Sequence, residues 1–206
     1  MVLVLEKRMG KLGDEPSFLI MRDKMQNKWD FPIFQIVGYK KSGKTTVMQE
    51  IIRYFSSMGL QVGTLKHHGH GGEPEQVKET DSYKHLKSGA AISSVKGKNQ
   101  FQITVNHATA ELDELIQFYT LLPLDILLIE GYKRAEYPKI VLIRNKEDLQ
   151  LLGNLSNIIA VGARDTALIK SLNYFTFQLE ELNNFLPGLM EYITVKLEVF
   201  EKGTRK

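Results

Sequence analysis

The feature that most constrains the fold is an eight-residue stretch, Gly38 to Thr45, that reads GYKKSGKT. It fits the pattern G-x-x-x-x-G-K-[ST] of a phosphate-binding loop without deviation. The apolar run PIFQIV precedes it, and residues 45–58 follow it with apolar side chains at helical spacing. A strand, a turn and a helix in this order aim backbone N–H groups and the positive end of a helix dipole at one anion. The sequence therefore predicts a nucleotide phosphate site at this turn.

Each fixed position of the loop has a chemical reason. The two glycines permit backbone angles that a Cβ would forbid. Lys44 supplies a mobile positive charge to the β- and γ-phosphates, and the Thr45 hydroxyl would coordinate Mg²⁺. The Thr46 hydroxyl can reach the α-phosphate. The predicted nucleotide-binding residues of the loop are Gly38, Tyr39, Lys40, Lys41, Ser42, Gly43, Lys44, Thr45 and Thr46.

A second acidic side chain is expected at the end of a neighbouring strand, where it would hold Mg²⁺ or its waters. The segment LDILLIEG offers Asp125 at its start and Glu130 at its end. Ligands of parallel sheets bind at the carboxyl ends of the strands. We therefore predict that Glu130 is a metal ligand with Thr45 and a catalytic residue with Lys44. Gly131 would let the backbone approach the γ-phosphate, and Asp125 is interpreted as an exposed residue at the strand start.

Strands and helices alternate along the chain from residue 32 onward. The expected strands are residues 32–37, 60–68, 90–97, 100–105, 125–131, 139–144 and 157–163; the expected helices are 45–58, 81–87, 109–122 and most of 179–200. This alternation predicts an α/β protein of the three-layer P-loop NTPase fold, with a mostly parallel sheet and some antiparallel strands. The link YKRAEYP is too short for a helix, so the strands on its two sides are expected to pair antiparallel.

Residues 1–30 mix charged and apolar side chains without a steady period. They are predicted to form a peripheral N-terminal extension, and residues 31–206 to form the nucleotide-binding domain. The chain has no cysteine, which excludes disulfides, thiolate metal sites and cysteine nucleophiles and fits a cytoplasmic location. The net charge of +3 does not indicate a nucleic-acid partner. No apolar run reaches the roughly 20 residues that a membrane-spanning helix needs.

The base preference is left open by two candidate sites. Asn145-Lys146-Glu147-Asp148 fits the N-K-x-D element with which many GTP-binding proteins read guanine. The antiparallel strand expected before it would point Asn145 away from the nucleotide. Arg164 and Asp165, after the strand at residues 157–163, are at least as good candidates. The choice between GTP and ATP therefore does not follow from these residues.

Four segments together resemble the molybdopterin-guanine dinucleotide biosynthesis protein B (MobB) family. They are VGYKKSGKTT, GLQVGTLKHHGH, ETDSYKHLKSGA and LLIEGYKRAEYPKIVLIR, and they occur in the family's order and approximate spacing over residues 32–165. The resemblance implies a GTP-binding, weakly hydrolysing protein that forms a homodimer. Its partners would be molybdopterin, or the molybdenum cofactor, and the guanylyltransferase that joins GMP to molybdopterin. The first 30 residues are not part of the family's usual pattern.

Three further residues are assigned with the help of this resemblance. Lys66 and His67 end a strand and can face the γ-phosphate or a second anionic ligand such as molybdopterin. Asp81 would orient Mg²⁺ waters or the attacking water; the alternative is an ordinary residue at a helix N-terminus. Four histidines of this region could hold a metal, although their spacing does not match an ordinary zinc site: His67, His68, His70 and His85.

The predicted reaction is attack of a positioned water on the γ-phosphate of Mg·GTP, with Lys44 and the loop amides stabilising the developing charge. No arginine is placed as a finger within the chain, so hydrolysis is expected to be slow and an adaptor role is favoured. A small-molecule kinase is a rival, but the sequence lacks an Arg-rich lid. A metal-insertion GTPase has support only from the histidine loop. An inactive binding module conflicts with the intact Lys44 and Thr45.

Overall fold

The chain forms two compact units in a computed structural model that describes residues 28–67, 74, 76–106, 111–189 and 191–192. One unit comprises residues 1–67 with 123–206, and the other comprises residues 68–122. Most of the predicted N-terminal extension, residues 1–27, lies outside the described residues. No helix in the described part of the chain is long and apolar enough to cross a membrane.

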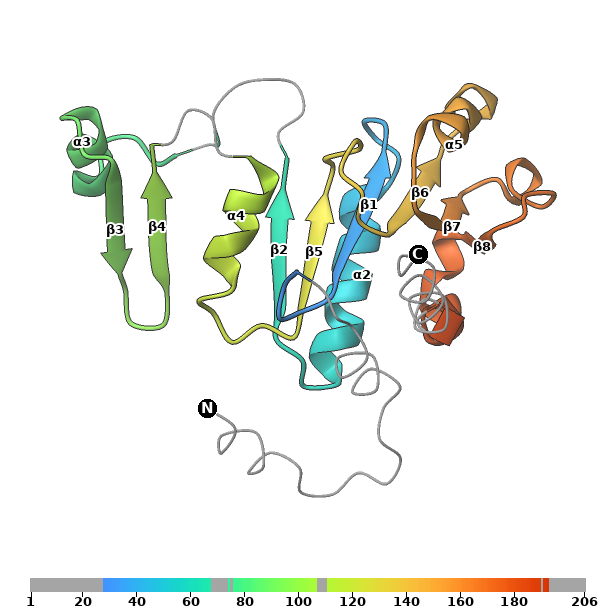
Figure 1. The fold of residues 1–206 in the computed structure, drawn as a ribbon, viewed down its shortest axis with the longest axis horizontal. Helices are drawn as coiled ribbons and strands as arrows, with labels where there is room; N and C mark the ends of the chain where they lie inside the picture. Colours follow the sequence, from blue (N-terminus) through green and yellow to red (C-terminus); the bar gives the residue numbers. More distant parts are fainter. Residues whose placement is uncertain (1–27, 68–73, 75, 107–110, 190, 193–206) are drawn as a thin grey trace, which may run out of the picture. The chain divides into compact units, whose positions relative to one another are not determined.

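The first unit is built on a six-stranded sheet with the order β2-β5-β1-β6-β7-β8 (Figure 1). All neighbouring strands in it pair parallel. The strands are β1 (Ile33–Gly38), β2 (Val62–Lys66), β5 (Ile126–Glu130), β6 (Lys139–Ile143), β7 (Ile158–Ala163) and β8 (Phe175–Gln178). The central strands β1, β5 and β6 are buried along their whole length, as the continuous apolar runs predict for a sheet covered on both faces.

Helices cover both faces of this sheet. Alternate residues such as Ile36, Leu128 and Leu142 pack with the apolar stripe of α2 (Lys44–Ser57) and with residues 182–189. The other alternate residues, among them Val37 and Val141, pack with Leu151 of α5 (Gln150–Asn154). The 3-10 turns η3 (Lys146–Leu149), η4 (Thr166–Leu168) and η5 (Leu179–Glu181) connect these elements. The prediction of a three-layer fold with a mostly parallel sheet is confirmed.

The register brings three strand ends together at one edge of the sheet. Glu130 of β5 lies opposite Ile36 of β1 and opposite Lys66 of β2. On the other side of β1, Gly38 lies opposite Leu142 of β6. Since parallel strands share one carboxyl edge, the chain that follows each of them begins beside the phosphate-binding loop.

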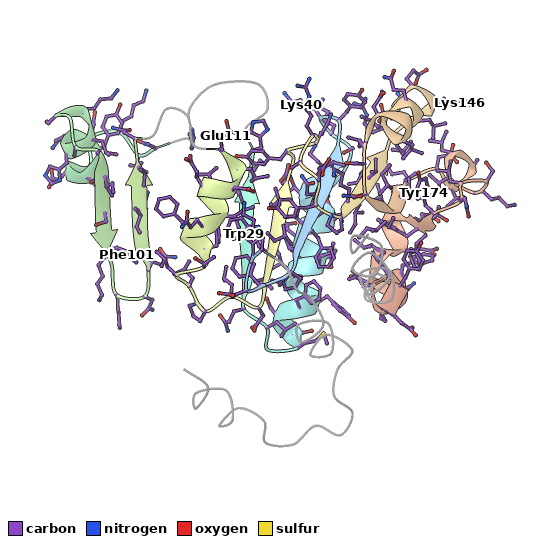
Figure 2. All side chains as sticks on the ribbon, in the orientation of Figure 1. Trp29, Lys40, Phe101, Glu111, Lys146 and Tyr174 are labelled. Atoms are coloured by element: carbon purple, nitrogen blue, oxygen red, sulfur yellow. The ribbon has the colours of Figure 1, made fainter. Side chains whose placement is uncertain are left out.

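The direction of β6 corrects the sequence analysis. β6 pairs parallel with β1 and is not a neighbour of β5. An extended chain covers about 3.3 Å per residue, so residues 131–138 are long enough to return to the opposite edge without a helix. Asn145 therefore follows the carboxyl end of β6, at the same edge as the loop, and not away from it. In Figure 2, Lys40 and Lys146 mark these two ends at the upper edge of the sheet. The edge strand β8, FTFQ in the sequence, was not predicted.

The second unit contains a helix, a hairpin and a further helix. α3 (Asp81–Lys87) is capped by Thr80, whose hydroxyl accepts a hydrogen bond from the Tyr83 N–H. β3 (Ile92–Lys96) and β4 (Phe101–Val105) pair antiparallel, and α4 (Leu112–Tyr119) begins with a capping box at Glu111. α3 and the two strands joined at residues 97–99 confirm the prediction for this region. The second helix was predicted over residues 109–122 and is observed over Leu112–Tyr119; residues 109 and 110 lie outside the described residues.

Candidate phosphate-binding site

The loop between β1 and α2 is closed tightly by its two glycines. A Cβ on Gly38 would lie 2.5 Å from Ser42 Oγ and 2.9 Å from the Leu142 carbonyl oxygen, so no larger residue fits. Gly43 has a φ of +93°, in the left-handed region that favours glycine. Its carbonyl accepts the Val47 N–H at 3.0 Å, which begins α2 directly after the turn. The loop thus has the strand–turn–helix geometry that places backbone donors around an anion.

The Lys44 side chain folds back over this loop. Its Nζ donates to the Tyr39 carbonyl oxygen at 2.9 Å. Burial lowers the pKa of Lys44, and the nearby Glu130 carboxylate opposes that shift. Ser42 is buried, and its Oγ has no hydrogen-bond partner among the described residues. The Lys44 ammonium has further N–H donors, and the Ser42 hydroxyl has no partner in the described part of the chain. Phosphate oxygens would accept hydrogen bonds from both groups, so the loop fits a nucleotide.

Glu130 lies next to this loop, at the end of β5. Its side chain is largely buried, and Lys66 Nζ is 3.5 Å from its Oε2. Its own carbonyl accepts the His67 N–H at 2.9 Å. Thr45 is exposed at the start of α2. The hydroxyl of Thr45 and the carboxylate of Glu130 are oxygen ligands of the kind Mg²⁺ prefers, so these two residues would hold that ion.

A turn after Glu130 is held against β1 by a buried glutamine that the sequence analysis missed. Gln35 Nε2 donates to the carbonyl oxygens of Gly131 at 3.0 Å and Tyr132 at 2.8 Å. The Gly131 N–H donates to the Ile36 oxygen at 3.1 Å, so this donor is already used. Gln35 is the one polar residue in the run PIFQIV, and this was the sequence signal that could have identified it. The exposed ring of His67 stacks on Tyr132, with ring centroids 4.5 Å apart.

Tyr39, the first residue after Gly38, is flanked by two cations. Lys133 Nζ lies 4.1 Å from the centroid of its ring, and the Arg144 guanidinium carbon lies 5.2 Å from it. Burial lowers the pKa of Lys133, and Asp148 opposes that shift. Lys40 and Lys41 are exposed, in keeping with solvated or phosphate-steering lysines.

Arg144 and Asp148 form an ion pair that the sequence analysis did not identify. Arg144 Nε donates to Asp148 Oδ2 at 2.7 Å, and Nη2 donates to Oδ1 at 2.8 Å. The hydrogen bond from Arg144 lowers the pKa of Asp148, and the same bond raises the pKa of Arg144. The spacing i, i+4 of opposite charges was visible in the sequence, but the tetrad pattern drew attention to Asn145 and Asp148 as base readers.

Several other predicted residues have local partners of their own or lie outside the described part of the chain. Asp81 lies on the second unit, exposed at the start of α3, with Lys84 Nζ 3.1 Å from its carboxylate; its catalytic role stays a prediction. Arg164 pairs with Glu180 at 3.2 Å, and Asp165 accepts the Ala167 N–H. His68 and His70 lie outside the described residues. Among the residues that are described, no three His, Asp or Glu side chains gather as a metal site would require.

The parallel sheet and the loop between β1 and α2 together define a protein of the P-loop NTPase fold. The model of the family "Molybdopterin guanine dinucleotide synthesis protein B" (MobB) matches residues 33–164, more than half of the chain. The chain belongs to the MobB family.

Individual relatives agree with this assignment. A protein named probable molybdopterin-guanine dinucleotide biosynthesis adapter protein, from Bacillus subtilis, is 46% identical over 134 residues, which cover 64% of this chain and 75% of that protein. The crystal structure of Bacillus subtilis MobB superposes with a TM-score of 0.67 at 36% identity, over 77% of this chain and 98% of that one. A MobB homolog from Bacillus stearothermophilus gives 0.63 at 35% identity, over 79% and 98%.

Proposed function

We propose that this chain is a GTP-binding, weakly hydrolysing adaptor in molybdopterin guanine dinucleotide biosynthesis. It would assist the guanylyltransferase that attaches GMP to molybdopterin. The observation that carries the proposal is the complete phosphate-binding loop, with its buried Ser42 hydroxyl and its Lys44 ammonium beside Glu130. The adaptor role is supported by the relatives, which are named adapter proteins of this biosynthesis.

The residues at the loop have distinct tasks in this proposal. Lys44 and the loop amides neutralise the charge that develops on the phosphates. Thr45 and Glu130 hold Mg²⁺, which supplies further charge stabilisation when bound. Lys66 and His67 are exposed at the end of β2 and would contact a second anionic ligand such as molybdopterin, in addition to their contacts with Glu130 and Tyr132.

Slow hydrolysis is supported by the state of two arginines near the carboxyl edge of the sheet. Arg144, after β6, is committed to Asp148 and to the Lys40 carbonyl oxygen. Arg164, after β7, is paired with Glu180. An arginine that stabilises the γ-phosphate is worth a factor of about 10³–10⁵ in rate. Because these two guanidinium groups are engaged elsewhere, neither supplies this stabilisation in the structure, which supports slow turnover of GTP without a partner.

Calorimetry with Mg·GTP and Mg·ATP tests the nucleotide assignment. We expect GTP to bind at least about tenfold more tightly, a difference of roughly 1.4 kcal/mol. The same titrations without Mg²⁺ serve as the control and are expected to show weaker binding of both nucleotides. Equal affinities would remove guanine from the proposal. Transfer of labelled phosphate to a small acceptor, instead of slow release of inorganic phosphate, would favour a kinase.

The adaptor role requires a separate measurement. Adding the chain to a reconstituted guanylyltransferase reaction is expected to raise the yield of molybdopterin guanine dinucleotide. An unchanged yield over a range of chain concentrations would contradict an assisting role. A cytoplasmic location belongs to the same proposal, is supported by the absence of cysteine, and is checked by cell fractionation.

A homodimer is the last part of the proposal, and the hairpin of the second unit offers a surface for it. Ile92, Phe101, Ile103 and Val105 lie on one face of the hairpin, and each is more than one third exposed; Phe101 is labelled in Figure 2. Light scattering is expected to give the mass of two chains, and Ile103→Lys to reduce it to one. Gln102→Lys, on the opposite face of β4, is the control and is expected to stay dimeric. A mass of one chain for the wild-type protein would contradict the proposed homodimer.

A further inference from the structure

We infer that Arg144 and Asp148 form a clamp that positions the phosphate-binding loop, and that the tetrad Asn145 to Asp148 does not read the nucleotide base. The inference rests on the proposed nucleotide binding and extends it. It assigns a positioning role to residues that the motif by itself would place against guanine.

The Asp148 carboxylate is not available to a base. Its side chain is only 1% exposed. Its Oδ1 accepts Arg144 Nη2 at 2.8 Å, and its Oδ2 accepts both Arg144 Nε at 2.7 Å and the Arg144 backbone N–H at 3.0 Å. A carboxylate that reads guanine must leave its two oxygens to the N1 and N2 groups of the base. Three charge-assisted or backbone bonds already occupy this one.

The side-chain oxygen of Asn145 is also used within the turn. Its Oδ1 accepts the Asp148 N–H at 3.2 Å and so caps the turn η3. The two polar residues that define the tetrad therefore bond to each other, and Asp148 also bonds to Arg144. Lys146 and Glu147, between them, are exposed. The polar groups of Asn145 and Asp148 therefore bond within the turn, and Asp148 fixes the position of Arg144.

Arg144 carries the connection from this turn to the phosphate-binding loop. Its Nη1 donates to the Lys40 carbonyl oxygen at 2.9 Å, and its guanidinium lies over the Tyr39 ring. Gln150, in the helix that follows the turn, donates to the Tyr39 hydroxyl at 3.3 Å. The first two variable residues of the loop are thereby tied to β6 and α5 through both backbone and side chain.

Tyr39 passes this restraint to the groups that would meet phosphate. Its carbonyl oxygen accepts Lys44 Nζ at 2.9 Å and the Ser42 N–H at 3.2 Å. Because the Arg144 guanidinium is already fixed by Asp148, it loses little conformational entropy when it also bonds to the Lys40 carbonyl oxygen. A loop that is ordered before binding does not lose further conformational entropy when the ligand binds, so it binds the phosphates more tightly. This gain does not depend on which base the nucleotide carries.

The test compares Asp148→Asn and Arg144→Ala with the wild-type chain, using Mg·GTP, Mg·ATP and Mg·XTP in calorimetry. We expect both variants to weaken GTP and ATP by the same factor, about tenfold, without gain for XTP. The exposed Lys146→Ala, in the same turn, is the control. Selective loss of GTP with a gain for XTP in Asp148→Asn would overturn the inference, because an amide that reads the base favours the 2-oxo group of xanthine. Unchanged affinities in folded variants would overturn it as well.

Hydrogen exchange keeps the inference separate from the proposed function. In nucleotide-free protein the amides of residues 39–43 are expected to exchange faster in both variants than in wild type, whether or not any nucleotide binds. Tyr39→Leu, at a half-exposed position, removes the side-chain part of this link, namely the ring beside Arg144 and the hydroxyl that accepts Gln150. It leaves the ion pair and the bond from Arg144 to the Lys40 carbonyl oxygen in place, and it is expected to accelerate the same amides. Exchange unchanged in Tyr39→Leu and in every folded variant of the pair would overturn the clamp. A wild-type chain that binds no nucleotide would instead overturn the proposed function.

Discussion

Replacing Lys44 with alanine is expected to weaken the binding of Mg·GTP by about 100-fold, equivalent to roughly 2.8 kcal/mol. The change removes the one ammonium group that lies within the loop and reaches its Tyr39 carbonyl. A charge-assisted hydrogen bond is worth about 1.5–3 kcal/mol, and the phosphates would receive more than one from this group. Calorimetry at constant Mg²⁺ measures the effect, and circular dichroism shows whether the variant is folded.

Lys41→Ala is the matched control for this prediction. Lys41 is a lysine of the same loop, but it is exposed and has a positive φ of 63°. A solvated charge contributes little to affinity, so we expect a change of less than about threefold. If Lys44→Ala bound Mg·GTP as tightly as wild type, the phosphate site would not be where the motif and the structure place it.

Replacing Glu130 with glutamine is expected to reduce GTP hydrolysis by at least about 10- to 100-fold, the range found when residues in the outer shell of a metal are changed. The side chain keeps its size but loses the charge that would hold Mg²⁺ with Thr45. Binding of GTP is expected to lose most of its dependence on Mg²⁺. Titrations of GTP over a series of Mg²⁺ concentrations, with phosphate release measured in parallel, check both effects.

Two controls separate a metal role of Glu130 from its ion pair. Asp125→Asn changes a carboxylate at the opposite end of the same strand, where Oδ2 accepts the Gln61 N–H, and is expected to leave hydrolysis unchanged. Lys66→Met removes the partner 3.5 Å from Glu130 but keeps the carboxylate. If Lys66→Met reproduced the loss of Mg²⁺ dependence, Glu130 would serve to hold Lys66 and not the ion.

Local patterns predicted much of both units correctly because they depend on near neighbours in the chain. β1 and α2 occur where the apolar run and the helical spacing place them, with the glycine turn between them. The boundaries of α3 agree with the sequence because Thr80 caps its start. By contrast, β8 has only four residues and gains its stability from pairing with β7, which no local pattern reveals.

The environment of Asp148 could not be predicted in the same way. The motif supplied the right residue types, and the structure places them at the right edge of the sheet. The buried Arg144 bond then takes the carboxylate away from solvent. Whether a carboxylate faces a ligand or a neighbouring guanidinium depends on which strand lies beside it and in which direction that strand runs.

By itself the sequence determined that this chain has a phosphate-binding loop, a strand before it, a helix after it, and an acidic residue at the end of another buried strand. These features are encoded by glycines, periodicity and charge within short segments, where backbone sterics and burial act on neighbouring residues. Only the tertiary structure decided that β6 runs parallel beside β1, that Gln35 holds the turn after Glu130, and that Arg144 grips the loop. Those outcomes depend on hydrogen bonds between residues far apart in the chain, which exist only once the strands have paired.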